Sequence, residues 1–369
     1  MNKYKLNDIC INITDGTHST VIDDETGSSY LLSCKNVKEG KIIINKTDRI
    51  INNETLLQLR KRTKMDQGDV VLTTVGTIGE SSYIKDNSPN FEFQRSVAIL
   101  KPNNDMVLSR YLHYFLISKD GQTKILSRIK GAAQPCLFLN DLKSVEILLP
   151  SINAQQHIVN TIGTIDDLVE IKEQEYTQKL NILLALFCSF ESKTHSKFGA
   201  AFETFNGGTF QSKNYVAFSN NKLITIKNVD DKGFNTESVS FLDDEHADNR
   251  FLLEIGDIVL TMTGNIGRTG IVDEENCYLN QRVLKIKCKS KSYLLAYLIK
   301  YKSEIIQLGK GTAQINLSLE DLKQLTVKNS IEEIKSFDRY DSIYNSLVNL
   351  KLTIKKAKKL KQLLLQKYF

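Results

Sequence analysis

Residues 68–79 read GDVVLTTVGTIG, and residues 256–267 read GDIVLTMTGNIG. Eight of the twelve positions are identical, more than two unrelated strands that share only a preference for Val and Gly would show. In each copy, a short run of β-branched and aliphatic residues lies between a Gly-Asp pair and a Gly-x-Ile-Gly segment. The pattern predicts a buried strand that runs into a tight, glycine-dependent loop.

Three further pairs of segments repeat in the same order along the chain. Lys35-Asn36-Val37 recurs as Lys227-Asn228-Val229, and Gln94-Arg95 recurs as Gln281-Arg282. Residues 131–143, GAAQPCLFLNDLK, recur as 311–323, GTAQINLSLEDLK, again with eight identities. The offsets between copies drift slowly, as small insertions in loops would make them. The chain therefore consists of two copies of a unit that is long enough for one domain and its connector.

The composition is that of a folded globular protein. The 369 residues are 41% hydrophobic and 25% charged, which suits about two domains. No run of about 18 uncharged apolar residues occurs, and the start, MNKYKLNDIC, lacks the apolar region of a signal peptide. We expect a cytoplasmic protein with no membrane partner. The six cysteines and five histidines are scattered without metal-ligand spacing, so no metal site is expected.

A long helix is predicted after each repeat. Residues 153–190 contain no Pro and one Gly, and their apolar residues recur at intervals of four and three. Residues 331–369 have a similar apolar stripe and lack both Pro and Gly. Each helix would be roughly 50 to 55 Å long. Because neither helix has a domain of its own to cover its stripe, we expect the two helices to pack on each other.

Charge predicts the orientation of this pair. The first helix is acidic in its first part, and the second is basic at its end, so antiparallel packing brings opposite charges together. The acidic residues are Asp166, Asp167, Glu170, Glu173 and Glu175. The basic residues are Lys355, Lys356, Lys358, Lys359, Lys361 and Lys367. The alternative is that these lysines form a solvated face or contact nucleic acid.

The globular halves read as short strands, glycine loops and a few helices. The best helix candidates are residues 106–119 and 292–308. We predict an α+β fold with two pseudo-repeated globular domains separated by a long antiparallel two-helix coiled coil. The expected segments are a first domain at 1–150, a central helical spacer at 151–193, a second domain at 194–330 and a C-terminal helical spacer at 331–369.

The sequence contains no repeated set of catalytic residues. No G-x-G-x-x-G opens a helix after a strand, and Gly309-Lys310-Gly311-Thr312 lacks the first glycine of a phosphate loop, because Glu304 stands there. Asp15-Gly16-Thr17-His18 suggests a base and a nucleophile. Its counterpart, Gly207-Gly208-Thr209-Phe210, has neither the acid nor the histidine. We therefore expect no catalytic residue in this chain.

Both copies instead retain glycines, small hydroxyls, amides and cations on loops. Such loops let backbone N–H groups and short side chains approach phosphates closely. The alternative is that the glycines serve only turns with positive φ. The candidate DNA-binding residues of the first half are Thr17, His18, Lys35, Thr73, Thr74, Gly76, Thr77, Gly79, Arg95 and Gln134. Those of the second half are Thr209, Lys227, Thr261, Thr263, Gly264, Asn265, Gly267, Arg282 and Gln314.

In this order, the segments resemble the specificity (S) subunits of type I restriction-modification systems. The resemblance is carried by DGTH at 15–18 and its GGT variant at 207–209, by both copies of the opening phrase, and by the Gln-Arg and G-x-A-Q segments. LLPSINAQQHIVNTIGTIDDLVE at 148–170 is similar to the start of the spacer helix in that family. The second half departs from the family at Phe210, where Pro is frequent, and at its helix start, which lacks Pro and Gln-Gln.

The resemblance implies a non-catalytic DNA reader with two target recognition domains, each reading one half of a bipartite, asymmetric target. The helices would set the spacing between the half-sites and dock two methyltransferase subunits, and two motor-nuclease restriction subunits would complete the complex. S-adenosylmethionine, ATP and Mg would bind only those partners. Two alternatives remain: a subunit of a methyltransferase-only or phase-variable system, and a duplicated coiled-coil scaffold that does not bind DNA.

Overall fold

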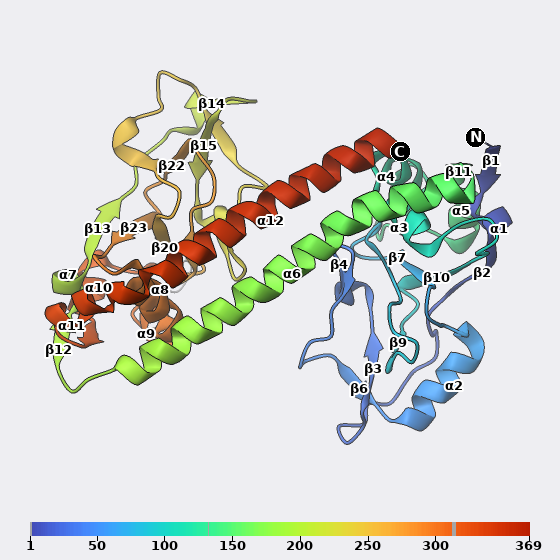
Figure 1. Ribbon diagram of the computed structural model, residues 1–369, viewed down its shortest axis with the longest axis horizontal. Helices are drawn as coiled ribbons and strands as arrows, with labels where there is room; N and C mark the ends of the chain where they lie inside the picture. Colours follow the sequence, from blue (N-terminus) through green and yellow to red (C-terminus); the bar gives the residue numbers. More distant parts are fainter. Residues whose placement is uncertain (1, 132, 312–314) are drawn as a thin grey trace. The chain divides into compact units, whose positions relative to one another are not determined.

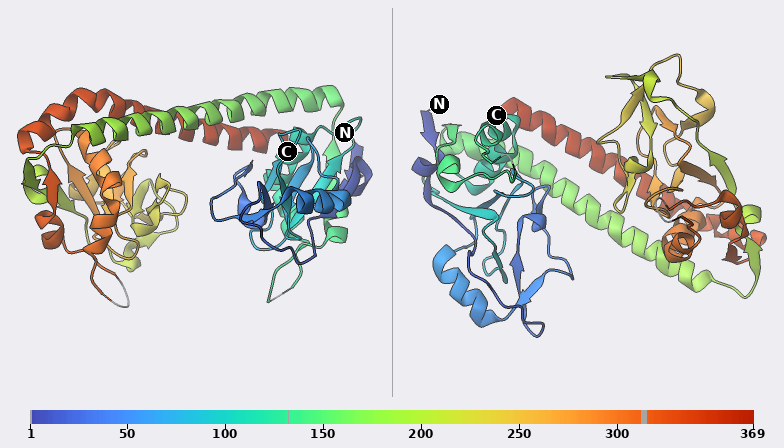
Figure 2. Two further views of the ribbon diagram at one scale, coloured as in Figure 1. Left: turned by 90° about the horizontal axis from the view of Figure 1, so that it is seen from below. Right: turned by 180° about the vertical axis from the view of Figure 1, so that it is seen from behind.

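The computed structural model describes residues 2–131, 133–311 and 315–369, and it folds as two compact units (Figure 1). Unit 1 comprises Met1–Asp167 and Lys358–Phe369, and unit 2 comprises Leu168–Ala357. Each unit contains one copy of the repeat and a part of each long helix. Within each unit, the helix segments lie along one side and the sheets along the other (Figure 2).

Unit 1 is built on a four-stranded antiparallel sheet. Its strands, in spatial order, are β2 (Cys10–Asp15), β10 (Val97–Pro102), β7 (Val70–Thr73) and β8 (Ser81–Tyr83). A second sheet has β3 (Ser29–Leu32) between β6 (Arg49–Ile51) and β9 (Phe91–Phe93), with β3 and β9 parallel. Two strand pairs complete the unit: β1 (Asn2–Lys5) with β11 (Glu146–Leu149), and β4 (Val37–Lys38) with β5 (Lys41–Ile42).

The short helices of unit 1 connect these strands. They are α1 (Leu6–Ile9), η1 (Cys34–Asn36), α2 (Asn53–Thr63), α3 (Ser109–Ile117), α4 (Lys119–Leu126) and α5 (Leu139–Lys143). The helix predicted at 106–119 is thus present, but it ends at Ile117 because Ser118 caps the next helix, with its hydroxyl accepting the Gly121 N–H at 3.1 Å. The buried face of α3 packs with β7 and β10 in the main core of the unit.

Unit 2 repeats the four-stranded sheet. Its strands, in spatial order, are β13 (Glu203–Asn206), β23 (Val283–Lys287), β20 (Ile258–Thr261) and β21 (Thr269–Ile271). The second sheet is larger than in unit 1 and has the order β14 (Tyr215–Val216), β18 (Ser240–Leu242), β15 (Asn221–Ile224), β22 (Cys277–Leu279) and β19 (Leu252–Leu253). Two pairs are β12 (His195–Lys197) with β24 (Thr326–Lys328), and β16 (Val229–Asp230) with β17 (Gly233–Phe234).

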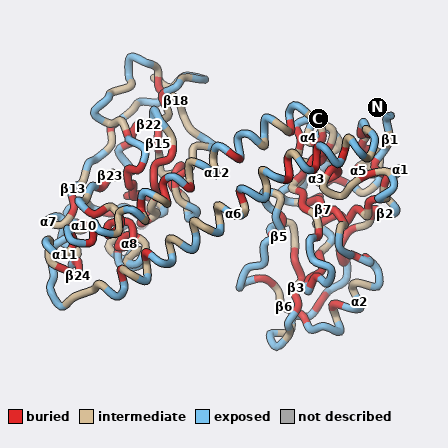
Figure 3. Tube along the Cα trace, viewed as in Figure 1, coloured by how far each residue is buried: buried red, intermediate tan, exposed pale blue. Residues whose placement is uncertain are grey.

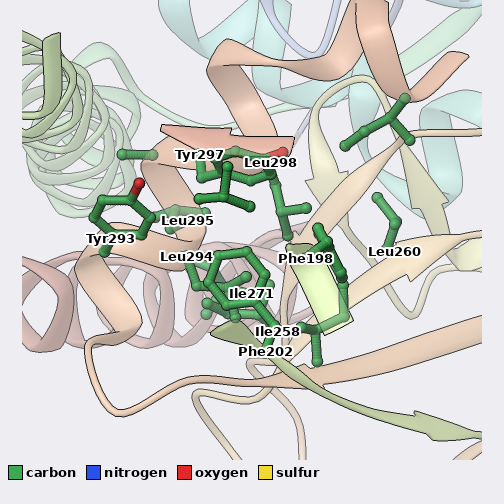
Figure 4. Close-up of a cluster of buried hydrophobic side chains, with 14 of the residues drawn as sticks. Phe198, Phe202, Ile258, Leu260, Ile271, Tyr293, Leu294, Leu295, Tyr297 and Leu298 are labelled. Carbon is green, nitrogen blue, oxygen red and sulfur yellow. The ribbon is translucent and has the colours of Figure 1, made fainter. Parts of the chain in front are cut away.

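The helices of unit 2 cover its main sheet. They are α7 (Phe198–Ala201), η2 (Ser212–Asn214), η3 (Ile226–Asn228), η4 (Asn249–Phe251), α8 (Lys291–Lys300), α9 (Lys302–Gln307), α10 (Leu319–Gln324), α11 (Ile331–Ser336) and η5 (Phe337–Tyr340). The helix predicted at 292–308 is therefore present as α8 and α9. Figure 4 shows the core where α8 residues Tyr293 and Tyr297 meet Phe198, Phe202 and the strands. Figure 3 shows buried positions concentrated in the sheets, α3 and α8.

The two predicted long helices are α6 (Ile152–Phe190) and α12 (Asp341–Tyr368), and they run antiparallel. In unit 1, Ile162 near the start of α6 and Leu365 near the end of α12 share one core. In unit 2, the order is reversed, with Leu183 of α6 and Leu347 of α12 in one core.

The charge argument for this orientation holds in part. Lys361 pairs with Asp166 at 2.6 Å, as predicted. Lys355 instead pairs with Asp273 at 2.9 Å and Glu274 at 2.6 Å, on the loop between β21 and β22, so the expectation that it would face the acidic part of the first helix is wrong. The reason is that Lys355 belongs to unit 2, where the loop between β21 and β22 carries both carboxylates.

The expectation of one continuous helix from residue 331 is wrong at its start. The chain forms α11 and η5 first, and α12 begins only at Asp341. Two contacts explain the break. The Phe337 side chain is fully buried in the core, and the Asp341 carboxylate accepts hydrogen bonds from the Ser292 N–H at 2.9 Å and from the Ser292 hydroxyl.

Candidate nucleic-acid interface

The repeated phrase forms the same strand and loop in both units, as predicted. All four residues of β7 and all four of β20 are buried. The Thr73 hydroxyl donates to the Thr77 carbonyl, and the Thr261 hydroxyl donates to the Asn265 carbonyl at 2.5 Å, so each threonine closes the loop that follows it. The loop glycines Gly76, Gly79, Gly264 and Gly267 all have positive φ, between 71° and 99°. The glycines are therefore required by the backbone of the loop.

The Gly-Asp pair that opens each phrase has a structural role that the sequence did not reveal. Asp69 lies 3.0 Å from the Lys101 amine on β10, and Asp257 lies 2.6 Å from the Lys285 amine on β23. Burial raises the pKa of Asp69, while the hydrogen bond from Lys101 acts in the opposite direction. The pairing of each aspartate with the neighbouring strand could have been inferred only from the register of the sheet.

In unit 1, five loops that are far apart in sequence meet at one end of the sheet. The Thr74 N–H donates to the Ser96 carbonyl at 2.9 Å, and the Leu137 N–H donates to the Thr74 carbonyl at 2.9 Å. The Arg95 N–H donates to the Thr17 carbonyl at 3.0 Å, and the Cys34 N–H donates to the Ser96 hydroxyl at 3.1 Å. We call residues 15–18, 33–36, 74–79, 94–96 and 133–137 the N-terminal loop cluster.

Unit 2 assembles the equivalent loops with equivalent hydrogen bonds. The Met262 N–H donates to the Arg282 carbonyl at 3.0 Å, and the Leu317 N–H donates to the Met262 carbonyl at 2.8 Å. The Gln281 N–H donates to the Gly208 carbonyl at 2.9 Å. We call residues 207–210, 225–228, 262–267, 280–282 and 315–317 the C-terminal loop cluster. The segments that recur at offsets of 180 to 192 residues thus come together in the same way within each unit.

Burial separates the candidate residues into two groups. Five threonines are buried, with at most 9% of their surface exposed, so their side chains support the loops: Thr17, Thr73, Thr74, Thr261 and Thr263. The exposed candidate side chains, which are available to a partner, are His18, Lys35, Thr77, Arg95, Gln134, Thr209, Lys227, Asn265 and Arg282. Gln314 lies outside the described residues.

The exposed cations differ in how they are held. Lys35 is 3.0 Å from Asp48. Although burial raises the pKa of Asp48, hydrogen bonds from Asn45, Lys35 and Asn36 outweigh that effect and lower it. In contrast, neither Arg95 nor Arg282 forms an ion pair with any residue that the structure describes. The sheet registers place Arg95 at the position of Gln281 and Arg282 at the position of Ser96, so the two arginines stand one residue apart in the two clusters. Each can bind an anionic partner without first breaking an internal pair.

A cavity of unit 2 lies elsewhere. It has a volume of about 780 Å³ and is lined by α7, the start of β13 and the end of β23 at Lys287. Arg282 precedes β23, so this cavity is at the end of that strand opposite to the C-terminal loop cluster. None of the candidate residues lines it.

Two searches of the described parts of the chain were negative. No group of three or more His, Cys, Asp or Glu side chains among residues 2–131, 133–311 and 315–369 is placed to hold a metal ion. Over the same ranges, no helix is both long enough and apolar enough to cross a membrane.

Two α+β units with matching sheets and loop clusters, each containing segments of both long helices, define a duplicated two-domain fold. Residues 2–181 and 190–334 match the family model of the type I restriction modification DNA specificity domain. The chain therefore belongs to this family.

Individual relatives agree with this assignment. The specificity subunit of the Escherichia coli type I restriction enzyme EcoBI is 31% identical over 140 residues, which are 38% of this chain and 29% of that relative. The MjaVIII specificity subunit of Methanocaldococcus jannaschii is 26% identical over an alignment that covers 92% of this chain and 86% of the relative. The first of these relatives is thus matched over less than a third of its length.

The S subunit of a type I restriction-modification system from M. genitalium has the same fold. Its crystal structure superposes with a TM-score of 0.59 at 14% identity, and the match covers 100% of this chain and 96% of that one. The predicted architecture of two α+β domains and an antiparallel helix pair is confirmed by this likeness and by the helices described above.

Proposed function

We propose that this chain is the DNA-specificity subunit of a type I restriction-modification complex. The observation that carries the proposal is the loop cluster that occurs once in each unit, each with an exposed arginine that forms no ion pair with a described residue, in a chain of this family. In this proposal, residues 1–150 and 194–330 are the two target recognition domains, and residues 151–193 and 331–369 are the helical spacers.

Each recognition domain reads one half of a bipartite, asymmetric target. The exposed cations Arg95 and Arg282 supply charge for phosphate or guanine, and the exposed amides Gln134 and Asn265 have the donor and acceptor pair that matches adenine. The buried threonines and the glycines hold the loops in place and carry no sequence information of their own.

Catalysis belongs to the partners in this proposal. Two methyltransferase subunits dock around the helices and bind S-adenosylmethionine, and two restriction subunits supply ATP- and Mg-dependent translocation and cleavage. The specificity subunit contributes no catalytic residue. By itself it binds DNA weakly, because its phosphate contacts are few and the complex shares them among subunits.

Methylation mapping tests this function. The chain is co-expressed with the methyltransferase subunit encoded beside it, and methylated adenines in host DNA are mapped with and without the chain. We expect an asymmetric target in two halves that appears only when the chain is present. An unchanged methylation pattern without the chain overturns the proposal. With the neighbouring restriction subunit added, cleavage of unmodified DNA identifies a full restriction system, and methylation alone identifies a methyltransferase-only one.

A further inference from the structure

The N-terminal loop cluster contains a pocket with a volume of about 240 Å³. It is lined by hydroxyls, amides and cations, with only two aliphatic side chains at its base. The lining residues are Thr17, His18, Ser19, Thr20, Val21, Leu31, Arg49, Gln94 and Arg95. Val21 and Leu31 are buried, so the accessible wall is polar. No Phe, Tyr or Trp side chain lines the pocket.

The DGTH segment is locked in place behind this pocket. The Arg62 guanidinium donates to the carbonyls of Asp15 and Gly16 at 2.9 and 2.7 Å, and to Asp15 Oδ1 at 2.6 Å. The other carboxylate oxygen, Oδ2, lies 2.7 Å from His18 Nε2. The Asp15 side chain is only 13% exposed, and both of its oxygens are occupied. Asp15 therefore orients the imidazole of His18 and is not available as a base.

This clamp directs one histidine nitrogen outward. Because Nε2 faces Asp15, Nδ1 is the ring nitrogen that remains for a ligand, and the side chain is 57% exposed. When both ring nitrogens carry a proton, both are donors, and Nδ1 can then donate to an anionic ligand.

Arg95 provides the second cation of the pocket. Its backbone N–H is bound to the Thr17 carbonyl at 3.0 Å, which fixes the residue beside the DGTH segment. Its guanidinium has no carboxylate partner in the part of the chain that the structure describes. Arg49 is different, because it is held by Asp23 at 2.7 Å and by the Val21 carbonyl, so it forms a wall of the pocket.

Unit 2 has aromatic rings beside the equivalent loop. The sheet register places Thr209 at the position of His18, and the next residue, Phe210, packs its ring edge-to-face on Phe251 with centroids 5.8 Å apart. Thr209 donates to the Gln281 side chain at 2.8 Å. A side chain at Gly208 would lie 2.7 Å from the Phe251 ring, which shows how closely this ring fills the space. Unit 2 therefore has a threonine at the position of His18, and aromatic rings pack against Gly208, which is at the position of Thr17.

We propose that the pocket of unit 1 holds one phosphate of the DNA backbone, bound by His18 and Arg95, and that this contact sets the register of the N-terminal domain on its half-site. The inference rests on the proposed function. A phosphate has only acceptor oxygens, and the pocket offers convergent donors from an imidazole, a guanidinium and hydroxyls. The pocket has no Phe, Tyr or Trp ring, and its cations favour an anion as the ligand.

Methylphosphonate substitution tests this contact, because it removes the charge of one phosphate and leaves the bases unchanged. The complex of the full chain with its methyltransferase subunit is titrated with duplexes that each carry one methylphosphonate across the N-terminal half-site. For the unchanged chain we expect one position at which binding weakens about tenfold. In His18→Ala and Arg95→Gln complexes, all duplexes bind about tenfold more weakly, and that position has no additional effect.

Two controls make the result specific. Arg95→Lys keeps the charge and should restore part of the effect. Lys5→Gln also removes one charge from unit 1. Lys5 precedes β2, whereas His18 follows it, so this variant should retain the methylphosphonate effect in full. In Arg95→Gln, the slope of the logarithm of the binding constant against the logarithm of the salt concentration should decrease in magnitude by about one, the contribution of one phosphate contact.

The inference is overturned if the methylphosphonate at that position weakens binding in the His18→Ala and Arg95→Gln complexes as much as it does in the complex of the unchanged chain. It is also overturned if these variants relax base preference in the N-terminal half-site with no phosphate effect, since the pocket would then read a base. Failure of the proposed function itself is distinguishable, because the unchanged complex would then bind no bipartite target at all.

Discussion

At the scale of single residues, burial decides which of the differences between the two phrases can act on DNA. The phrases differ at Thr74 and Met262, but these side chains are only 4% and 8% exposed. Thr77 and Asn265 also differ, and both are exposed at the tip of the loop. We therefore propose that, among the residues in which the two phrases differ, the exposed pair Thr77 and Asn265 carries specificity.

Exchanging these two residues tests that hypothesis. Asn265→Thr removes an amide that can bond both to an acceptor and to a donor of adenine, so we expect the preference at one base pair of the second half-site to weaken by about 1 to 3 kcal/mol. Thr77→Asn should alter only the first half-site. Methylation mapping of the two variants measures both changes, and an alteration in the wrong half, or in neither, contradicts the assignment.

A second residue-scale prediction concerns His113, which is buried with Nδ1 3.1 Å from the Ser81 hydroxyl. Burial, reinforced by Lys361, lowers the pKa of His113 from 6.5 to about 3. The ring is neutral in the folded chain, whereas the unfolded chain binds a proton below about pH 6.5. Unit 1 should therefore lose stability as the pH falls from about 6.5 toward 3, by roughly 1.4 kcal/mol per pH unit.

Replacement of the histidine isolates this contribution. Hydrogen–deuterium exchange of β7 and β10 is measured between pH 7 and pH 4.5, with rates corrected for the intrinsic effect of pH. The His113→Gln variant should lose part of the pH dependence, although its stability at pH 7 is lower. Equal pH dependence in both proteins would show that the ring is not neutral in the folded chain.

At the scale of elements, the long helices are held by the globular parts as well as by each other. The end of α12 packs into the core of unit 1, where the Phe369 ring lies 5.1 Å from the Tyr111 ring and the Tyr368 ring lies 6.4 Å from the His157 ring. Leu365 is 8% exposed in this core, whereas Leu363, on the same helix, is 54% exposed. Leu365 is therefore part of the core of unit 1, whereas Leu363 is not.

The two leucines form a matched pair for measurement. Leu365→Ala removes buried methyl groups and should lower the stability of unit 1 by about 2 to 3 kcal/mol. Leu363→Ala changes helix propensity by the same amount and should lower the stability of unit 1 by no more than about 0.5 kcal/mol. Urea denaturation of the full chain, with exchange in unit 1 as a local probe, gives both values. Similar losses in the two variants would mean that α12 is not docked through Leu365.

At the scale of the whole molecule, each unit contains a segment of α6 and a segment of α12. Unit 1 combines its own globular part with the last residues of the chain, and unit 2 contains the end of α6 and the start of α12. The helices cross from one unit to the other after Asp167 and after Ala357. Under the proposed function, the length of the two helices between the recognition domains sets the spacing of the half-sites.

Lengthening both helices together tests this role. Seven residues inserted after Asp167 and seven after Ala357 add two helical turns, about 10 Å at 1.5 Å per residue, and nearly preserve the helix faces. At about 3.4 Å per base pair, the gap between the mapped half-sites should grow by about three base pairs while the half-sites stay the same. An unchanged gap would exclude the helices as the determinant of spacing. Insertion in one helix alone serves as the mismatched control.

Much of this organisation is readable from the chain alone, because it depends on local patterns. The repeated phrase predicts β7 and β20 with their glycine loops, and the 4-3 spacing of apolar residues predicts α6 and most of α12. The pairing of Lys361 with Asp166 follows from charge along the helices. The family resemblance follows from the order of short motifs, each of which is unspecific when taken singly.

Other features depend on contacts between distant residues and became visible only in the folded chain. The Gly-Asp aspartates pair with Lys101 and Lys285, because the register of neighbouring strands places them there. The break before Asp341 arises because Phe337 is buried and because Ser292, 49 residues away, binds the aspartate. Likewise, His18 and Arg95 line one pocket only because the sheet brings residues 17 and 95 into hydrogen-bond contact. Periodicity and repetition are properties of neighbouring residues, whereas register, burial and pockets arise from long-range packing that no local pattern encodes.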